Sequence, residues 1–489
     1  MAKILSELLE GIPHTLLQGD SGISVTGICM DSRKTEPGNV FLCISGYQTD
    51  GHTYIPKALE AGATALVVEH EVDVPANITV IKVEDARAAL ALLSATWFDH
   101  PSKEMTIVGL TGTKGKTTTA HMIKKILEEA GNKVGMIGTN GAFIGDEKVD
   151  LDIRNTTPES FDLQYLFRTM KDAGCSHVVM EVSSQGLKLN RVLGIDFDYG
   201  AFLNLSPDHI SPTEHADLEE YKNCKKMLFS MVKKSVIFMD CEHSPEFLKA
   251  AVNPVTVSLK GEADFSVTDI HNLWDGTMFG VEFDITEKGK TANHVAIAMP
   301  GYFNAENAAV AIAVGSLEGI SMQVMDAALR KVSVKGRTQI IPKALKKACV
   351  VIDYAHNAFS SECVLEMLRE YKPKRLICVF GCGGNRAAAR RIGMGEVAGR
   401  MADLCIITMD NPRSEPMSEI NKGIIEGIEK SGGKYIAIDD RKEAIYYALD
   451  NAEPGDIIAL LGKGHETYQE IEGVRYHFSE EEVVNEYFS

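Results

Sequence analysis

A glycine-rich stretch, Leu110-Thr-Gly-Thr-Lys-Gly-Lys-Thr-Thr-Thr119, has the residue types of a phosphate-binding loop. In such a loop, backbone N–H groups and the amino end of the following helix face a phosphate chain. Lys116 would reach the β- and γ-phosphates, and the Thr117 hydroxyl would coordinate Mg²⁺. The strict pattern asks for glycine where Leu110 stands, so only the shorter core Thr-Gly-Thr-x-Gly-Lys-Thr is met. The alternative is an ordinary glycine turn before a helix.

The segments on either side have the periodicities that such a loop needs. Residues 105–109 are apolar and β-rich, which predicts a strand. Apolar side chains then recur at helical spacing between Thr119 and Ala130, and Gly131 is a plausible helix end. We therefore predict a strand, a glycine loop and an amphipathic helix.

Two later apolar stretches end in polar residues. Residues 177–184 predict a strand that ends in Glu181 and two serines, and residues 202–209 predict a strand followed by Asp208 and His209. A carboxylate downstream of a phosphate loop is typical of Mg²⁺ coordination or water positioning, although a buried structural glutamate is the alternative. His209 taken alone could equally be a capping residue. A helix predicted over 221–231 carries Lys225 and Lys226, which taken alone would be solvated.

The first hundred residues have the pattern of a small α/β unit. Strands are predicted at 40–44 and 65–68, and helices at 54–61 and 86–98. Polar clusters at 31–34 and 46–52 flank the first strand. They suit phosphates and sugars, but loops are polar in any case, so a binding role and a merely solvated loop both stay open.

The last third, from Gly336 onward, alternates strands with helices. Strands are predicted at 348–353, 375–380, 404–408, 435–438 and 457–461. This alternation predicts a mostly parallel, doubly wound sheet. Charged loops follow three of these strands, at 381–386, 410–413 and 462–466. Because ligands bind at the carboxyl ends of such strands, we predict a second site there.

Composition narrows the class of protein. The chain has 489 residues, about three domains' length. Its net charge of −18 argues against nucleic-acid binding. No run of eighteen apolar residues occurs, so we expect no membrane span and a cytoplasmic location. The ten cysteines form no C-x-x-C pair, and we expect free thiols.

Together, these motifs resemble the Mur ligase family over essentially the whole length and in the right order. The resemblance implies an α/β protein of three domains: a small N-terminal domain for the UDP end of the substrate (1–100), a central P-loop ATPase-like parallel-sheet domain for ATP (101–335), and a C-terminal Rossmann-like doubly wound domain for the amino acid (336–489). The family joins a carboxylate to an amine through an acyl phosphate, at the expense of ATP.

The resemblance is strongest to members that add the third residue of the peptidoglycan peptide. It implies ATP and Mg²⁺, the substrates UDP-N-acetylmuramoyl-L-Ala-D-Glu and meso-diaminopimelate, and a monomer. By resemblance, the catalytic residues are Lys116, Glu181, His209 and Lys225, and the metal ligands are Thr117, Glu181, His209 and Lys225, the lysine as a carbamate. The Tyr221-x-x-x-Lys225 spacing favours Lys225 over Lys226.

The remaining site residues also follow from the resemblance. ATP would contact Thr111, Gly112, Thr113, Lys114, Gly115, Lys116, Thr117, Thr118, Arg337, Asp353 and His356. The nucleotide-linked dipeptide would contact Ser32, Thr156, Thr157, Ser183 and Arg191. The incoming amino acid would contact Arg386, Asp410, Asn411, Pro412, Arg413, Gly462 and Glu466.

In the family, the Asp-Asn-Pro-Arg motif at 410–413 goes with meso-diaminopimelate rather than L-lysine. The distal carboxylate of diaminopimelate can pair bidentately with Arg413, which would repel the ammonium of lysine. The alternatives are a ligase of the superfamily with another acceptor, such as L-lysine, or a folylpolyglutamate synthase. A diverged non-catalytic paralogue and a simple NTPase or kinase are further alternatives.

Overall fold

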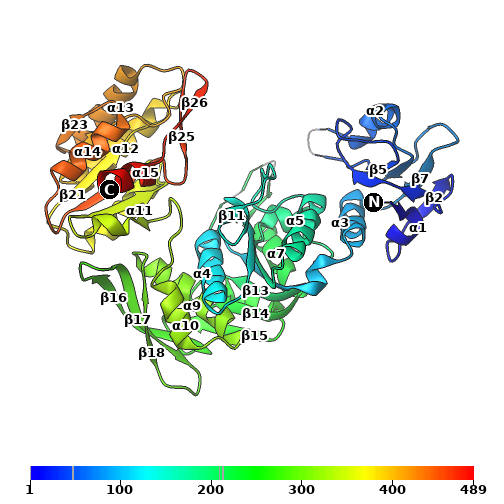
Figure 1. Cartoon of the computed structure of the whole chain (residues 1–489), viewed down its shortest axis with the longest axis horizontal. Helices are drawn as coiled ribbons and strands as arrows, with labels where there is room; N and C mark the ends of the chain where they lie inside the picture. The colour runs from blue at the N-terminus through cyan, green and yellow to red at the C-terminus, as the bar shows by residue number, and fades with distance from the viewer. Residues whose placement is uncertain (1, 47–48, 209, 212–213) are drawn as a thin grey trace. The chain divides into compact units, whose positions relative to one another are not determined.

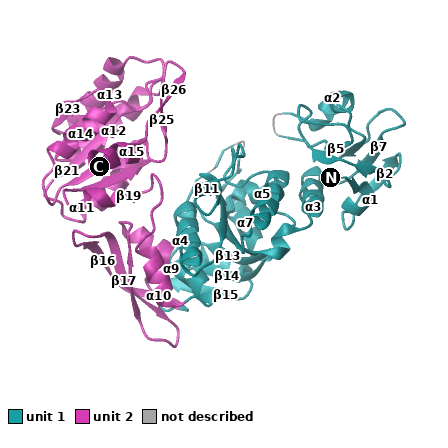
Figure 2. Ribbon diagram, viewed as in Figure 1, with its two compact units in different colours: residues 1–258, 262–264, 310–320 teal, residues 259–261, 265–309, 321–489 magenta. Residues whose placement is uncertain are grey.

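The computed structural model describes residues 2–46, 49–208, 210–211 and 214–489, and the chain forms two compact units (Figure 2). Unit 1 comprises Met1–Ser258, Glu262–Asp264 and Val310–Ile320. Unit 2 comprises Leu259–Gly261, Phe265–Ala309 and Ser321–Ser489. Figure 1 labels the helices and strands. His209 lies outside the described residues.

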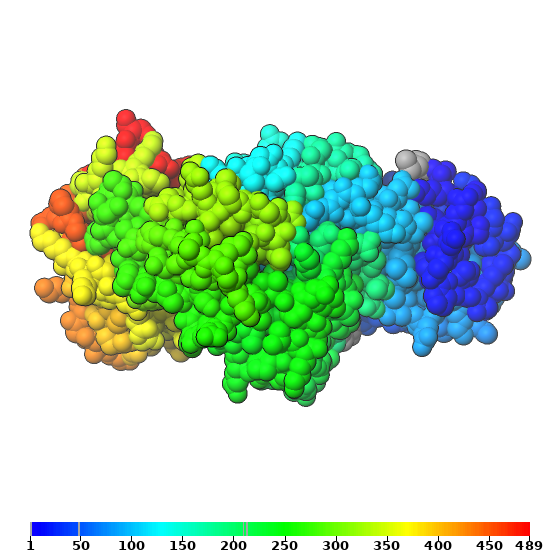
Figure 3. Space-filling view, turned by 90° about the horizontal axis from the view of Figure 1, so that it is seen from below, coloured from blue at the N-terminus to red at the C-terminus, as the bar shows by residue number. Residues whose placement is uncertain are grey.

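The N-terminal part of unit 1 has its own five-stranded sheet, in the order β2-β7-β6-β5-β4. Its strands are β2 (Thr15–Gln18), β4 (Gly27–Cys29), β5 (Asn39–Leu42), β6 (Ala65–Val68) and β7 (Thr79–Lys82), all parallel except β2. Helices α2 (Ile55–Glu60) and α3 (Ala86–Trp97) match the predicted ones. In the space-filling view the blue N-terminal residues form one continuous body (Figure 3). The predicted small α/β unit is confirmed.

The smaller elements of this part frame that sheet. The short strands β1 (Lys3–Ile4) and β3 (Ser24–Val25) pair with each other, and helix α1 (Leu5–Leu8) follows the first of them. Single 3₁₀ turns lie at Gly51–Tyr54 and Pro101–Glu104. The second turn begins at Pro101, next to the expected boundary near residue 100, and leads into the central sheet.

The central sheet of unit 1 holds the glycine loop. Its strands run β11-β10-β9-β12-β8-β13-β14-β15. The parallel strands are β8 (Thr106–Thr111), β9 (Val134–Gly138), β12 (His177–Glu181), β13 (Phe197–Phe202), β14 (Val232–Phe238) and β15 (Pro254–Ser258); the edge strands β10 (Gly141–Ile144) and β11 (Glu147–Lys148) are antiparallel. The helices are α4 (Lys116–Glu129), α5 (Ser160–Asp172), α6 (Ser184–Lys188), α7 (Leu218–Lys226) and α8 (Ser244–Ala250).

Three predicted boundaries in this sheet were wrong. The strand predicted within 202–209, before Asp208 and His209, lies earlier, at Phe197–Phe202, and the Asn204 carbonyl beyond it accepts from the Thr113 N–H of the glycine loop. The strand predicted over 177–184 ends at Glu181, because Ser183 caps α6 through the Gly186 N–H. The helix predicted over 221–231 starts earlier, at Leu218, and becomes a 3₁₀ turn over Met227–Ser230.

Unit 2 combines an antiparallel ribbon with a parallel sheet. The ribbon consists of β16 (Phe265–Trp274), β17 (Phe279–Glu287) and β18 (Asn293–Ile297), followed by α9 (Tyr302–Leu317, whose last turns belong to unit 1) and α10 (Met322–Leu329). The sheet runs β19-β20-β24-β21-β22-β23. Its strands are β19 (Gln339–Ile340), β20 (Cys349–Asp353), β21 (Leu376–Phe380), β22 (Leu404–Ile407), β23 (Tyr435–Ala437) and β24 (Ile457–Leu461), all parallel except β19.

Helices cover both faces of this six-stranded sheet. One hydrophobic core includes α11 (Ala358–Arg369), α12 (Ala388–Met401) and α13 (Met417–Lys430); the other includes α14 (Arg441–Asp450) and α15 (Glu480–Tyr487) (Figure 1). A hairpin of β25 (Tyr468–Ile471) and β26 (Val474–His477) precedes α15. The predicted doubly wound fold is therefore confirmed, and the buried strands explain its continuous apolar runs.

Two further expectations concern the whole chain. Across the described residues, no helix is both long and apolar enough to span a membrane. All ten cysteines are free thiols, as predicted.

Candidate functional site

The glycine-rich loop joins β8 to α4 at the carboxyl edge of the central sheet, as predicted. Gly115, the residue before the helix, has φ +84°, a left-handed conformation that glycine adopts without strain. Gly115 is the N-cap residue and has no side chain with which to cap this helix end. The first N–H groups of α4 are therefore available to an anion such as a phosphate.

Two lysine ammonium groups converge on one carbonyl of this loop. Lys116 Nζ donates to the oxygens of Gly112 (2.8 Å) and Thr113 (3.1 Å), and Lys225 Nζ donates to the same Gly112 oxygen (2.9 Å). Only 1% of Lys225 is exposed. Burial, together with the charge of Lys116, holds the pKa of Lys225 well below its usual range. Lys226, the next residue, is half-buried.

Glu181 ends β12 directly beside the loop, and only 3% of it is exposed. The Thr117 hydroxyl donates to Glu181 Oε1 (2.8 Å), and so does the Thr139 N–H (3.0 Å). A hydroxyl and a carboxylate are hard oxygen ligands of the kind that Mg²⁺ prefers. Thr117 and Glu181 therefore fit a magnesium site in front of the phosphate loop.

A cavity of about 180 Å³ opens beside these groups. It is lined by Lys116, Asn155, Thr156, Ser183, Ser184, Gln185, Arg191, Glu214, Tyr221 and Lys225. The structure thus brings Thr156, Ser183 and Arg191 together with both lysines, although they lie far apart in sequence. Thr157 is buried behind them, where its hydroxyl bonds to the Glu181 carbonyl (3.0 Å) and accepts from Ser183 N (2.9 Å).

Arg191 is oriented toward this cavity by its neighbours. Its Nη1 donates to the Thr157 carbonyl (3.1 Å) and its Nη2 pairs with Glu159 Oε1 (2.7 Å). The remaining donor, Nε, is buried and has no protein partner among the described residues, as is also true of Gln185 Nε2. Buried unpaired donors beside a cavity favour an anionic ligand, because an unsatisfied donor costs about 1–3 kcal/mol.

Other predicted residues of unit 1 have different surroundings. Thr111 and Thr113 are buried; Thr111 Oγ1 bonds to the Val182 carbonyl (2.9 Å), and Thr113 Oγ1 lies 3.2 Å from Tyr221 Oη. Lys114 is exposed, whereas Thr118 is half-buried in the first turn of α4. Ser32 lies in the loop after β4, between Asp31 and Arg33, whose side chains form two hydrogen bonds (2.9 and 2.7 Å).

The three charged loops of unit 2 meet at the carboxyl edge of its sheet, as predicted. They line a cavity of about 130 Å³ formed by Tyr354, His356, Gly381, Cys382, Gly383, Arg386, Arg390, Asp410, Asn411, Arg413, Gly462 and Glu466. Every residue predicted to contact the amino acid is among these, apart from Pro412. Pro412 is buried between two of them.

Hydrogen bonds connect these loops. Arg413 Nη1 donates to the Gly384 carbonyl (2.8 Å), and Asn411 Nδ2 donates to Glu466 Oε2 (3.0 Å). Lys463, fully buried, donates to Asn411 Oδ1 (2.9 Å) and to Glu466 Oε2 (2.7 Å). Burial raises the pKa of Asp410, an effect that the cations Arg441 and Lys463 oppose.

The residues predicted to hold ATP from unit 2 lie at the end of β20. Asp353 accepts from the N–H groups of Thr338 (2.7 Å) and Ala355 (2.8 Å), so each oxygen of its carboxylate is hydrogen-bonded to the backbone. The Arg337 guanidinium lies 5.8 Å from the centre of the Tyr354 ring. His356 Nδ1 lies 2.9 Å from the Tyr354 carbonyl and the ring borders the cavity of unit 2.

Three family models match consecutive parts of the chain. The Mur ligase family catalytic domain matches residues 24–98, the Mur ligase middle domain residues 110–315, and the Mur ligase glutamate ligase domain residues 336–464. The chain belongs to the Mur ligase family. The predicted domain boundaries near residues 100 and 335 stay predictions.

Curated relatives of this Mur ligase family member match over nearly their full length. UDP-N-acetylmuramoyl-L-alanyl-D-glutamate--2,6-diaminopimelate ligase of Caldanaerobacter subterraneus subsp. tengcongensis is 42% identical, over 99% of this chain and 98% of that protein. The corresponding ligase 1 of Clostridium acetobutylicum is 40% identical, with the same coverage. A solved structure of a ligase of the same name covers 100% of this chain and 99% of its own, with 30% identity and a TM-score of 0.77.

Sequence reasoning missed several residues of the two candidate sites. Thr139, whose N–H holds Glu181, follows β9, and its only sequence signal is its place after an apolar strand. Gln185 follows the predicted serines but carries no motif of its own. Lys463 lies inside a loop that was predicted to bind ligand, yet burial rather than charge is what distinguishes it.

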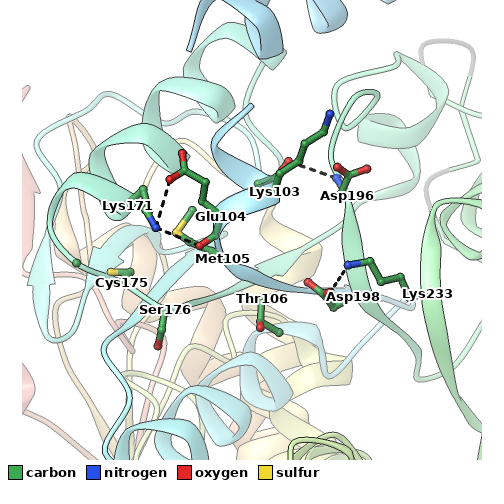
Figure 4. A pocket seen from close by; sticks show the side chains of 12 residues that line it. Lys103, Glu104, Met105, Thr106, Lys171, Cys175, Ser176, Asp196, Asp198 and Lys233 are labelled. Carbon is green, nitrogen blue, oxygen red and sulfur yellow. Dashed lines mark hydrogen bonds and ion pairs between the residues drawn. The ribbon is translucent and has the colours of Figure 1, made fainter. Parts of the chain in front are cut away.

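A second cavity of unit 1, about 790 Å³, lies at the amino ends of β8, β12 and β13 (Figure 4). Two pairs of its charged side chains are close: Lys233 Nζ lies 2.7 Å from Asp198 Oδ1, and Lys171 Nζ lies 3.4 Å from Glu104 Oε2. This is the edge of the sheet opposite to the glycine loop, where parallel sheets do not usually bind their ligands.

Proposed function

We propose that this protein is an ATP-dependent amide ligase that joins meso-diaminopimelate to the D-Glu carboxylate of UDP-N-acetylmuramoyl-L-Ala-D-Glu. The observation that carries the proposal is the combination of a phosphate loop and anion-binding cavity in unit 1 with the arginine-containing cavity of unit 2. The names of the full-length relatives support the same acid and the same amine.

The proposed reaction begins with transfer of the γ-phosphoryl group of ATP to the carboxylate. Lys116 and the first N–H groups of α4 hold the phosphates. Thr117 and Glu181 hold Mg²⁺, and His209 is proposed, by resemblance, to be a further ligand of Mg²⁺. Mg²⁺ bound there would neutralise charge that develops on the transferring group. Thr156, Ser183 and Arg191 hold the acid, and Ser32 is proposed to hold the UDP end.

Lys225 is proposed to act as a carbamate. Its ε-amine attacks CO₂, an N–C bond forms, and one proton leaves, so that a buried cation becomes an anion. Only the neutral amine can attack, and burial beside Lys116 favours that form. The carbamate oxygens would then serve as a further metal ligand next to the loop carbonyl of Gly112.

The amine then displaces phosphate from the acyl phosphate and forms the amide bond. We propose that Arg386, Asp410, Asn411, Arg413 and Glu466 hold this acceptor. Arg413 presents a planar guanidinium that matches a second carboxylate, which meso-diaminopimelate carries and L-lysine lacks. The proposed ATP contacts of Arg337, Asp353 and His356 rest on the resemblance.

The reaction is proposed to occur in the cytoplasm, as the sequence predicts, and to be catalysed by a monomer, as the resemblance implies. The test is phosphate release with ATP, Mg²⁺ and the UDP-linked dipeptide, run in parallel with meso-diaminopimelate, L-lysine and no amino acid. Release only with diaminopimelate, together with a tripeptide product by mass spectrometry, is expected. Release with L-lysine would contradict the role of Arg413, and no release in any arm would contradict the ligase reaction itself.

A further inference from the structure

Beneath the acceptor cavity of unit 2 lies a buried arginine that none of the sequence motifs contains. Arg441, the first residue of α14, donates through Nη2 to the carbonyl of Leu461 (2.8 Å) and through Nη1 to the carbonyl of Met409 (3.2 Å). The next residues in the chain are Gly462 and Asp410, which both line the cavity. One guanidinium therefore joins the starting points of two cavity loops.

The same guanidinium is anchored on its other side. Arg441 Nε and Nη2 donate to Glu480 Oε1 (3.0 and 2.6 Å), and both side chains are fully buried. A buried ion pair is no efficient way to stabilise a fold, because desolvation offsets the attraction. A cation in the first turn of α14 is also unfavourable to the helix dipole. The pair is therefore better explained by the two loop carbonyls that Arg441 bonds to than by a contribution to the stability of α14.

We propose that Arg441, anchored by Glu480, is a positioning residue for the acceptor amino acid, because it fixes the separation between the 409–413 and 462–466 loops. This inference rests on the proposed function. The loops carry Asp410 and Arg413 on one side and Gly462 and Glu466 on the other. Catalysis between bound reactants is sensitive to shifts of about 1 Å, so a loose loop would weaken acceptor binding.

Arginine is needed at this position for a geometric reason. Its planar fork donates at once to two carbonyls and a carboxylate, which lie in different directions. A lysine ammonium at the end of a flexible stem cannot bridge all three. Lys463 contacts the same loops nearby, at Asn411, Glu466 and, at 3.8 Å, Asp410, but it reaches neither the Met409 nor the Leu461 carbonyl in the hydrogen bonds described.

The chain offers a matched control at the other end of the same strand. Arg375 donates through Nη2 to Asp456 Oδ2 (2.5 Å) and to the Asn451 carbonyl (2.7 Å), and Asp456 is fully buried. Asp456 directly precedes β24, whereas Leu461 ends it. Arg375→Lys thus weakens an arginine–carboxylate pair in the same sheet, at the edge away from the acceptor cavity, although the Arg375 side chain is 35% exposed.

The experiment compares Arg441→Lys and Arg375→Lys in the full-length enzyme by phosphate release, with each substrate varied in turn, and by thermal unfolding. We expect Arg441→Lys to raise the KM for meso-diaminopimelate by about tenfold or more, with the KM for ATP and for the UDP-linked dipeptide within about twofold. Arg375→Lys should lower the unfolding temperature yet leave the acceptor KM within about twofold.

Glu480→Gln is the second, milder variant, because it keeps a hydrogen-bond acceptor but removes the charge that anchors Arg441. It should also raise the KM for meso-diaminopimelate, and it tests the inference on its own if Arg441→Lys does not fold. An unchanged acceptor KM in either folded variant overturns the inference, as does an equal rise for all three substrates. Failure of the proposed function is distinct, because the wild-type enzyme itself would then release no phosphate.

Discussion

The close approach of Gly138 to Glu181 makes a stringent test of the proposed metal site. Gly138 ends β9, and a Cβ atom placed on it would lie 2.3 Å from Glu181 Oε1 and 2.9 Å from Cδ. Ordinary contact begins near 3.4 Å. In Gly138→Ala the carboxylate must therefore retreat by about 1 Å from a position fixed by Thr117 and Thr139.

A displacement of about 1 Å can cost about 10²-fold in rate, equivalent to about 2.7 kcal/mol of transition-state stabilisation. Overpacking should also cost about 1–3 kcal/mol of folding free energy. We therefore expect Gly138→Ala to lower kcat by about 10²-fold and to raise the Mg²⁺ concentration needed for half-maximal phosphate release.

Gly135→Ala is the matched control, since it overpacks the same strand against Met170 Sδ, 2.4 Å from the added Cβ, rather than against Glu181. It should lose comparable stability, measured by urea unfolding, but keep its kcat within about threefold and its Mg²⁺ dependence. The reasoning is refuted by a Gly138→Ala enzyme with wild-type kcat and Mg²⁺ dependence, or by an equal loss in both variants.

Three further predictions follow from single contacts. Lys225→Ala should abolish phosphate release, and a short carboxylic acid should partly restore it by replacing the carbamate; no rescue would argue against the carbamate. Arg413→Ala should raise the KM for meso-diaminopimelate by about 10- to 10²-fold, because a charge-assisted pair contributes about 1.5–3 kcal/mol, and it should do so without raising the KM for ATP. The hydrogen bond to His177 lowers the pKa of Glu318 in the folded protein. The contact therefore stabilises unit 1 fully above the ordinary glutamate pKa of about 4.3, and this stabilisation is lost as the pH falls through the lowered pKa of folded Glu318. Glu318→Gln should therefore flatten the dependence of the unfolding temperature on pH between about 5 and 3, and an unchanged slope would contradict the assignment.

The sequence was sufficient to predict the type and order of the main strands and helices around the two candidate sites. Alternating apolar strands and helices predicted the parallel sheets, because strands buried on both faces must be apolar throughout. Because ligands bind at the carboxyl ends of parallel strands, the sequence predicted that the loops at 381–386, 410–413 and 462–466 lie at one edge of the sheet. In the structure, residues of these loops line one cavity.

The ends of the strands and helices were harder to predict from the sequence, because contacts with distant residues decide where each element stops. The strand expected within 202–209 lies instead at Phe197–Phe202. Asn204 bonds across to the glycine loop, and the apolar pattern carries no sign of that partner. His209, on which one proposed metal contact depends, lies outside the described residues.

Only the tertiary structure decided which buried charges meet. Lys225 and Lys226 are neighbours in the same helix, yet folding directs Lys225 to the carbonyl of Gly112, 113 positions away in the chain. Arg441 and Glu480 resemble any other exposed helix-starting residues in the sequence, but in the folded protein they form a fully buried pair under the acceptor loops. The physical reason is that periodicity records which face of an element is buried, whereas the partner of a buried charge depends on how distant elements pack.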